Sequence, residues 1–124
     1  MLNKAPKQLV LKTEANEIPA GNVTIRQYFP QILPTLDLSS ALITGTHPEK
    51  GGWLRNNGVD EMYFVISGTG RLLFGDGTCL ELIPESAALI RKTTKFRVEE
   101  AKNLYMVVVT SPAWSPEQYE HLVE

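Results

Sequence analysis

The hydrophobic and polar residues of this chain follow a strand pattern, in which short apolar runs and period-two alternation are interrupted by glycine and proline. Residues 23–29 alternate until Pro30, and residues 40–44 form a second segment of this kind. Further strands are predicted at residues 53–55, 61–67, 70–74, 78–83, 87–92, 95–98 and 104–110. Short strands at close intervals with no helix between them predict an antiparallel sandwich or barrel.

Turn signals separate these predicted strands. The sequence Asn-Asn-Gly at residues 56–58 suits a tight turn, because Asn and Gly tolerate positive φ. We interpret Gly-Thr-Gly at residues 68–70 as a hairpin turn, since it lacks the lysine and the following helix of a phosphate-binding loop. Only the C-terminal end departs from the pattern, where Ser115 and Pro116 suit the start of a short helix.

The chain has 124 residues, which is the length of one domain, residues 1–124. We expect its core at about residues 22–112, an N-terminal arm or edge strand at residues 1–21, and a helical or extended tail at residues 113–124. Residues 30–38 form a loop that we expect to reach across a barrel mouth.

The composition, 43% hydrophobic and 21% charged, is ordinary for a soluble globular protein. A net charge of −2 gives no electrostatic reason to expect nucleic acid or an anionic membrane as a partner. The first apolar run is too short for a signal peptide, and no span is long enough to cross a bilayer. Cys79 is the single cysteine, so it forms no internal disulfide. We therefore predict a cytoplasmic protein.

One acidic residue lies where a buried negative charge would be energetically costly. Glu61 leads the apolar segment at residues 61–67. A carboxylate that faces a core is costly unless it is ion-paired, hydrogen-bonded or protonated. The sequence therefore predicts a specific partner or a bound proton for Glu61.

Glu61 and Gly68 also have the spacing of a known strand motif, Glu, six residues, Gly. Gly77 and Pro84 fit a second motif, in which Ser86 stands at the position of an inner glycine. Together, over residues 40–112, these features resemble a small single-domain cupin. The resemblance implies an all-β cupin or jelly-roll fold, which is a double-sheet antiparallel β-barrel, with a short helical or extended C-terminal tail.

The same resemblance implies a metal site whose ligands this chain lacks. The family's three histidines fall on Leu54, Asn56 and Leu89, and Thr93 takes the place of an asparagine. A divalent metal held by three histidines and a glutamate needs imidazole nitrogens at about 2 Å. Leucine supplies no donor, and the asparagine carbonyl is a weak one. We expect no metal and no other cofactor at this site.

Strand alternation places Glu61, Tyr63 and Val65 toward the barrel interior. The residues that face the other side are Met62, Phe64 and Ile66. One interpretation is that an arginine neutralises Glu61 in a structural ion pair. The other is that Glu61 and Tyr63 contact a ligand or act as catalytic base and acid. The sequence leaves both open.

Such an interior has the composition of a ligand pocket, with apolar walls and few polar groups. The apolar walls are expected at Leu54, Leu89 and Val65. The candidates for ligand binding are Trp53, Arg55, Asn56, Arg91 and Arg26. Arginine favours a ligand that carries a carboxylate or a phosphate. Trp53 suits either stacking on a ring or filling volume.

The remaining chemical candidates favour structural roles. His47 and His121 are the only histidines, and both are expected to be solvated. Trp114 lies in a proline-containing tail and is expected to pack over the barrel.

Three functions are compatible with these features. The first is a metal-free barrel that binds a small organic molecule, for example an anionic or sugar-like one. The second is a metal-independent sugar isomerase, epimerase or cyclase that uses Glu61 and Tyr63 as acid and base. The third is a structural or partner-binding module with a filled barrel. The outward-facing apolar residues of the Glu61 strand would be unusual on a soluble monomer, and we predict a homodimer.

Overall fold

The computed structural model of the protein describes residues 8–30 and 32–123, and the elements within them are almost all strands. The strands are β1 (Asn16–Ala20), β2 (Val23–Gln27), β3 (Asp37–His47), β4 (Trp53–Asn56), β5 (Asp60–Phe74), β6 (Cys79–Leu82), β7 (Ala87–Ile90), β8 (Lys95–Ser111) and β9 (Tyr119–Leu122). One 3-10 turn, η1 (Pro116–Gln118), precedes β9. The predicted all-β fold is confirmed, including its short helical and extended tail.

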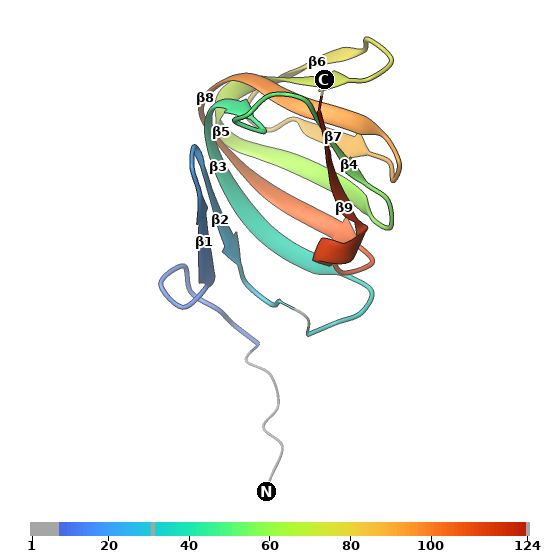
Figure 1. Cartoon of the computed structure of the whole chain (residues 1–124). Helices are drawn as coiled ribbons and strands as arrows, with labels where there is room; N and C mark the ends of the chain where they lie inside the picture. Colours follow the sequence, from blue (N-terminus) through green and yellow to red (C-terminus); the bar gives the residue numbers. More distant parts are fainter. Residues whose placement is uncertain (1–7, 31, 124) are drawn as a thin grey trace, which may run out of the picture.

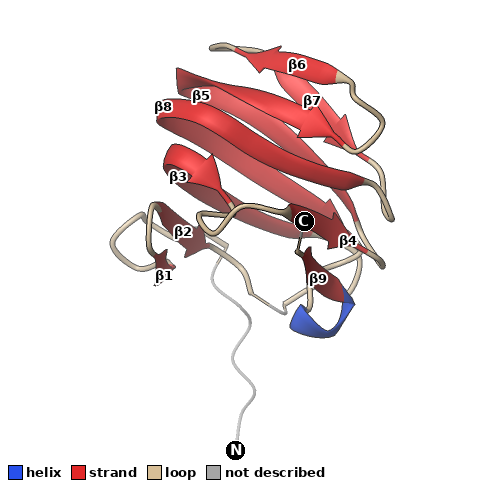
Figure 2. Ribbon diagram, turned by 45° about the horizontal axis from the view of Figure 1, so that its top comes forward, coloured by secondary structure: helices blue, strands red, loops and turns tan. Residues whose placement is uncertain are grey.

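All strand pairs are antiparallel, and the sheet curls into a barrel with two layers (Figures 1 and 2). The long strands β5 and β8 run side by side and belong to both layers. The first half of β5 and the second half of β8 lie with β3, β2, β1 and β7. Their other halves lie with β6, β4 and β9. The barrel interior therefore lies between two faces that share the same two strands.

The Gly-Thr-Gly sequence at residues 68–70 is not a hairpin turn, and that prediction was wrong. It lies inside β5, which continues to Phe74 through a series of register shifts against β8. Gly68 has φ +78°, and a Cβ there would lie 2.0 Å from the backbone oxygen of Asn103. Glycine is required because the two strands bend together at close approach, as in a β-bulge. For the same reason the strands predicted at residues 95–98 and 104–110 are one strand, β8.

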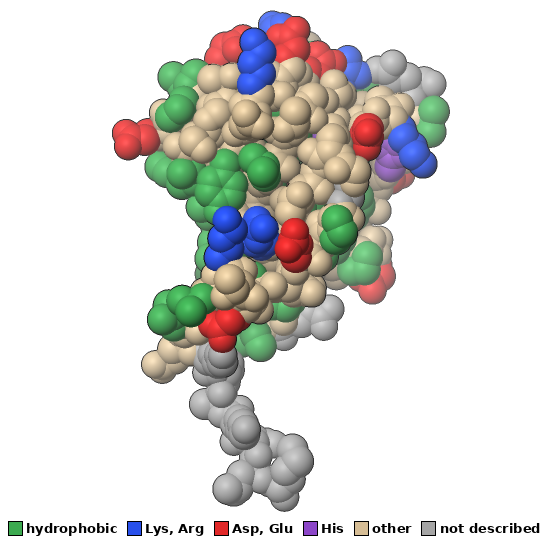
Figure 3. Space-filling model, turned by 90° about the vertical axis from the view of Figure 1, so that its left-hand side faces the viewer, with side chains coloured by type: hydrophobic (Ala, Val, Ile, Leu, Met, Phe, Trp, Pro, Cys, Tyr) green, Lys and Arg blue, Asp and Glu red, His purple; other side chains and the backbone are tan. Residues whose placement is uncertain are grey.

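The predicted alternation of the Glu61 strand is confirmed. Along the first half of β5, Glu61, Tyr63 and Val65 are buried, with at most 9% of each residue exposed. The residues between them are 43–50% exposed, namely Met62, Phe64 and Ile66. Hydrophobic side chains also gather on the side of the molecule shown in Figure 3. The strand thus separates an interior that contains one carboxyl group from an apolar outer face.

Both ends of the chain are packed against the barrel over their described parts. β1 is an edge strand on β2, and residues 1–7 of the predicted N-terminal arm or edge strand lie outside the described residues. The segment before β3 contacts the segment after β8, since the Ala113 N–H donates to the Pro34 carbonyl at 3.1 Å and the Ser111 hydroxyl donates to the Thr35 carbonyl at 2.9 Å. No helix in the described part of the chain is long and apolar enough to cross a membrane.

Candidate functional site

One end of the barrel collects most of the buried polar side chains. Among the described residues, five polar or charged residues are buried, and four of them lie at the same end: Asp37, Asn56, Glu61 and Thr110. They stand at the start of β3, the end of β4, the start of β5 and near the end of β8. We call this end of the barrel, which these four residues define, the polar end. Asp37 pairs with Thr110, and Thr110 pairs with Glu61, so three of the four form one row across neighbouring strands.

Glu61 is the most perturbed acid of the polar end. Its residue is 9% exposed, and burial raises the pKa of its carboxyl from 4.5 to about 7, although a hydrogen bond from the Tyr63 hydroxyl lowers it in part. Among the residues that the structure describes, no cation contributes to this pKa. Glu61 therefore populates both its protonated and its ionised form near neutral pH.

Two tyrosines lie close to Glu61. Burial and the negative charge of Glu61 raise the pKa of Tyr63 well above its usual value. The same two causes raise the pKa of Tyr119, the first residue of β9, to about 12. Both hydroxyls thus keep their protons at neutral pH and can donate hydrogen bonds to Glu61 or to a ligand oxygen.

The C-terminal segment covers the polar end. The Trp114 indole N–H donates to the Asn56 side-chain oxygen at 3.2 Å, and the Gln118 amide donates to the same oxygen at 3.0 Å. The Trp114 and Tyr119 rings meet edge to face with centroids 5.6 Å apart. The expectation that Trp114 packs over the barrel is confirmed, and β9 is held in place beside Glu61.

The residues at the family's metal positions do not fit a metal ion. Leu54 is buried and offers no donor, and the Asn56 oxygen already accepts two hydrogen bonds. Leu89 was expected inside, but it is 51% exposed, and its neighbour Ile90 faces inward opposite Glu61. The motif alignment was one residue off, because strand alternation places the even-numbered residues of β7 inside. Among the described residues, no group of three or more His, Cys, Asp or Glu side chains is placed to hold a metal.

The three arginines proposed as partners of Glu61 lie elsewhere. Arg26 is 3.7 Å from the Glu17 carboxylate, and Arg55 is 2.8 Å from the Glu120 carboxylate. Arg91 lies 3.5 Å from the Asp60 carboxylate, and its side chain is 73% exposed. Arg26 and Arg55 neighbour inward-facing residues of their strands, so alternation places them outside, and Arg91 follows the inward-facing Ile90 just beyond the end of β7.

Trp53 and the histidines are also away from Glu61. Trp53 packs under the Arg97 guanidinium, which lies 4.3 Å from its ring centroid. His47 ends β3, at the opposite end of that strand from Asp37, and burial lowers the pKa of its imidazole. The His121 ring nitrogen is 2.8 Å from the Gly51 carbonyl oxygen. Of the predicted site residues, the structure brings together only Glu61, Tyr63 and Asn56.

Sequence reasoning missed Asp37, Thr110 and Tyr119 as members of this site. Asp37 carried one usable signal, since it is an acidic residue at the start of a strand, as Glu61 is. Thr110 and Tyr119 carried none, because their proximity to Glu61 arises from strand pairing over long sequence separations.

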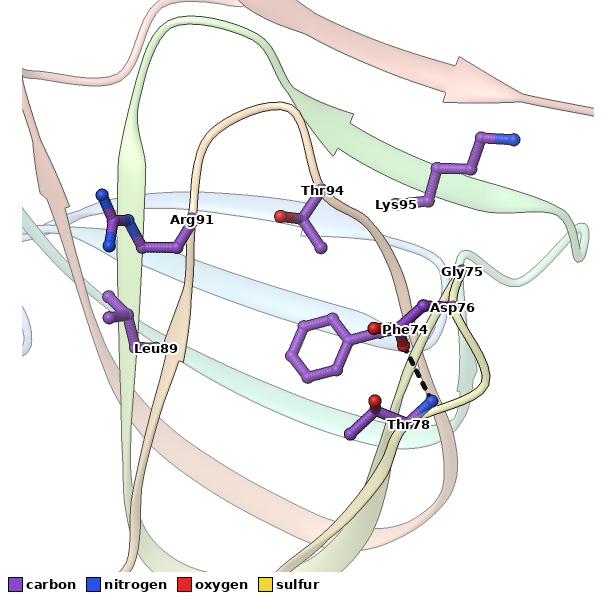
Figure 4. A pocket seen from close by; sticks show the side chains of 8 residues that line it. All are labelled: Phe74, Gly75, Asp76, Thr78, Leu89, Arg91, Thr94 and Lys95. Carbon is purple, nitrogen blue, oxygen red and sulfur yellow. Dashed lines mark hydrogen bonds between the residues drawn. The ribbon is translucent and has the colours of Figure 1, made fainter.

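Two surface hollows lie on other parts of the molecule. The first, of about 600 Å³, is shown in Figure 4 and is lined by Phe74, Gly75, Asp76, Thr78, Leu89, Arg91, Thr94 and Lys95. There the Phe74 ring points toward Leu89, and the Asp76 carboxylate accepts a hydrogen bond from the Thr78 N–H at 2.8 Å. The second, of about 330 Å³, lies beside residues 8–10. Neither is lined by Glu61 or Tyr63.

No protein-family model and no curated protein sequence matches the chain, but solved structures do. A tyrosine-to-phenylalanine variant of Streptomyces PAC13 with uridine has a TM-score of 0.82 at 15% identity, with 95% of this chain and 92% of that chain covered. Pac13 is a nucleoside dehydratase. KdgF from Halomonas sp. has a TM-score of 0.71 at 13% identity, covering 86% and 96% of the two chains.

A third structure, the polyketide cyclase RemF from Streptomyces resistomycificus, has a TM-score of 0.74 at 14% identity, covering 96% and 87%. These neighbours are cupin-fold proteins. The chain therefore has the fold of a small single-domain cupin barrel, as the sequence resemblance implied.

Proposed function

We propose that the protein binds a small organic molecule at the polar end of its barrel and that Glu61 exchanges a proton with that molecule. The observation that carries the proposal is a carboxyl group that is buried, hydrogen-bonded to Tyr63 and shifted to a pKa of about 7. A structural ion pair would lower this pKa rather than raise it. Within the described residues, no cation contributes to this shift, and this favours proton transfer by Glu61 over a structural role.

The chemistry follows from the two protonation states of Glu61. A general base works best when its pKa is close to the pH of the reaction, because it is then both available and strong enough to take a proton. Ionised Glu61 would remove a proton from a ligand carbon or oxygen, and protonated Glu61 would return it. Tyr63 holds the carboxyl in place, and Tyr119 is a second donor that can stabilise a negative charge on a ligand oxygen.

Such a site is suited to isomerisation, epimerisation, cyclisation or elimination of water, none of which requires an external redox partner. Proteins of the same fold include a nucleoside dehydratase and a polyketide cyclase, and this supports acid–base chemistry as a use of the barrel. At these low identities the likeness concerns the fold, so the reaction of this chain rests on its own residues.

We infer the route to the site from the partial exposure of the C-terminal segment that covers it. Tyr119 is 37% exposed, although its ring contacts Trp114 and its hydroxyl is close to Glu61. We infer that the ligand enters beside Tyr119, between η1 and the loop that precedes β3. Binding would then change the environment of the Trp114 indole N–H, which is bonded to Asn56.

The proposal is tested by proton exchange into the ligand. The protein is incubated in D2O with a panel of small molecules that includes uridine, an aldose and a hydroxy acid, and deuterium at carbon is measured by mass spectrometry. Exchange that is present in the wild type and lost in Glu61→Gln supports the proposal. The matched control is Glu81→Gln, which changes an exposed glutamate on β6 and should exchange as the wild type does.

Binding is followed in parallel through the Trp114 indole N–H signal in proton–nitrogen NMR spectra. If uridine and the other probes leave the signals of Trp114, Tyr63 and Glu61 unchanged at millimolar concentration, and no exchange occurs, the proposed function is wrong. Such a result would favour the alternative of a structural barrel whose interior is filled.

A further inference from the structure

Three inward-facing residues at the polar end form a row across neighbouring strands. Asp37 of β3 is paired with Thr110 of β8, which is paired with Glu61 of β5. The three residues are 9%, 4% and 9% exposed, respectively. Neighbouring strands are about 5 Å apart, so the row presents oxygen atoms at three successive positions along roughly 10 Å.

Two atoms of this row have no hydrogen-bond partner within the described part of the chain. They are Oδ1 of Asp37 and Oγ1 of Thr110. The carboxyl of Asp37 does accept a hydrogen bond from the Leu38 backbone N–H, so only part of its bonding capacity is used. Buried polar atoms are almost always bonded in native proteins, and an exception calls for an explanation. Two adjacent exceptions in one row point to a shared external partner.

We propose, on the basis of the function proposed above, that this row binds the hydroxyl groups of a sugar ring or similar polyol, with Asp37 and Thr110 holding neighbouring hydroxyls while Glu61 meets the reacting position. A ligand hydroxyl can both donate and accept a hydrogen bond. It can therefore bond to the Asp37 carboxyl, which accepts, and to the neighbouring Thr110 hydroxyl, which does either. The row carries two carboxyl groups, and the arginines at positions 26, 55 and 91 pair with acids elsewhere. An anionic ligand would therefore find no cationic partner among these arginines, and a neutral polyol is favoured.

A cationic amine is the competing ligand, because carboxyl groups attract it. The burial of the row argues against it, since burial disfavours the ionised carboxylates on which an amine would depend, and the pKa values of both Asp37 and Glu61 are raised by burial. The test therefore includes an amine probe.

The first arm of the test compares uridine with 2′,3′-dideoxyuridine, which lacks two ring hydroxyls, and with putrescine as the amine. Binding is measured from the NMR shifts of the backbone amides of Asp37, Thr110 and Glu61. We expect uridine to bind roughly ten- to a hundredfold more tightly than the dideoxy compound, because two hydrogen bonds are lost. Equal binding of the two nucleosides, tighter binding of putrescine, or no shift of the row by uridine would overturn the inference.

The second arm uses Thr110→Val, which removes the hydroxyl but keeps the shape of the side chain. Because this hydroxyl is unpaired and buried, the variant should melt at a higher temperature, by roughly 3 to 6 °C, and should lose the preference for uridine over the dideoxy compound. The matched control, Thr24→Val on the outer face of β2, should keep the preference. If Thr110→Val lowers the melting temperature, the hydroxyl already has a stabilising partner such as a structural water, and the inference fails.

The two proposals fail separately. Deuterium exchange that depends on Glu61 but occurs equally in ligands with and without ring hydroxyls would retain the proposed function and reject the polyol row. Hydroxyl-dependent binding without any exchange would retain the row and reject proton transfer by Glu61.

Discussion

The two ends of the barrel interior are built from the same long strands but differ in chemistry. Near the end of β5 and the start of β8, Leu72, Phe96 and Val98 are at most 2% exposed and pack in an apolar core. At the other end of the same strands lie Glu61 and Thr110, which are also buried, at 9% and 4% exposed, but polar. We call the first region the apolar end. Burial alone therefore does not define the core, because burial at the polar end also encloses groups that oppose folding.

The difference has a physical cost that marks the polar end as functional. Each large side chain buried at the apolar end contributes about 1.5–3 kcal/mol to folding. At the polar end, an unpaired hydroxyl and a carboxyl that resists ionisation both oppose folding. Natural proteins retain such features chiefly where they serve function. The predictions below test this contrast, beginning with the largest expected effect.

At the apolar end, Leu72→Ala should lower the free energy of unfolding by about 2–5 kcal/mol, because it opens a cavity among fully buried side chains. Denaturant unfolding measures the change. Leu33→Ala is the control, since Leu33 is 51% exposed in a loop and its loss should change stability by no more than about 0.5 kcal/mol. Equal effects for the two variants would show that the apolar end is not the stabilising core.

At the polar end, Glu61→Gln should alter the pH dependence of stability. The folded-state pKa of about 7 lies above the value of 4.5 that applies to the unfolded chain, so the folded state binds the proton more tightly. The contribution of Glu61 to the free energy of unfolding is fully present below pH 4.5. It is lost as the pH rises to about 7, by roughly 3 kcal/mol in total.

Unfolding experiments between pH 4.5 and 8 check this prediction. The glutamine variant should lack this loss, whereas Glu81→Gln should keep the wild-type slope. A wild type and a Glu61→Gln variant with the same slope would contradict the assignment of Glu61 as a buried, neutral-pH acid.

The cover of the polar end is tested by Asn56→Ala. The change leaves the Trp114 indole and the Gln118 amide without their shared acceptor, which should lower the free energy of unfolding by about 1–3 kcal/mol. Hydrogen exchange of η1 and β9 should become faster, while that of β6 stays the same. The exposed neighbour Asn57→Ala should have a smaller effect on stability. Unchanged exchange in β9 would mean that other contacts hold the C-terminal segment.

The outer face of β5 extends the comparison to the surface. We propose that the apolar residues of this face join two copies of the chain, because Met62, Phe64 and Ile66 lie exposed in a row. Light scattering should then give twice the chain mass of 13.8 kDa. Phe64→Glu should give the monomer mass while the stability of the monomer fold changes little, by about 0.5 kcal/mol. A wild type that is monomeric at micromolar concentration would refute the dimer.

Much of the fold could be predicted from the sequence, since alternation along β5 correctly placed Glu61 and Tyr63 inside and Phe64 outside. The same alternation also implies the positions of the strand arginines. Arg55 lies between Leu54 and Asn56, which both face inward, so its outward position was already implied. The error at Leu89 came from carrying the motif's fixed spacing from Pro84 through the turn into β7, where a difference of one residue reverses the face of every side chain.

The rest of the site could not be predicted, because it depends on the cross-strand register. Thr110 reaches Glu61 only through the pairing of β8 with β5, and Asp37 only through the pairing of β3 with β8. Tyr119 reaches Glu61 because β9 returns to pair with β4. No local pattern encodes such contacts between residues that are far apart in the chain.

The central claim is that Glu61 is a buried proton carrier at neutral pH, and a carbon-13 NMR titration of its side-chain carboxyl tests it most directly. The Glu61 signal is assigned by comparison with the spectrum of Glu61→Gln. The account predicts a titration midpoint of about 7. A midpoint near 4.5, the ordinary value for a glutamate, would contradict it and would leave the polar end without an acid–base group.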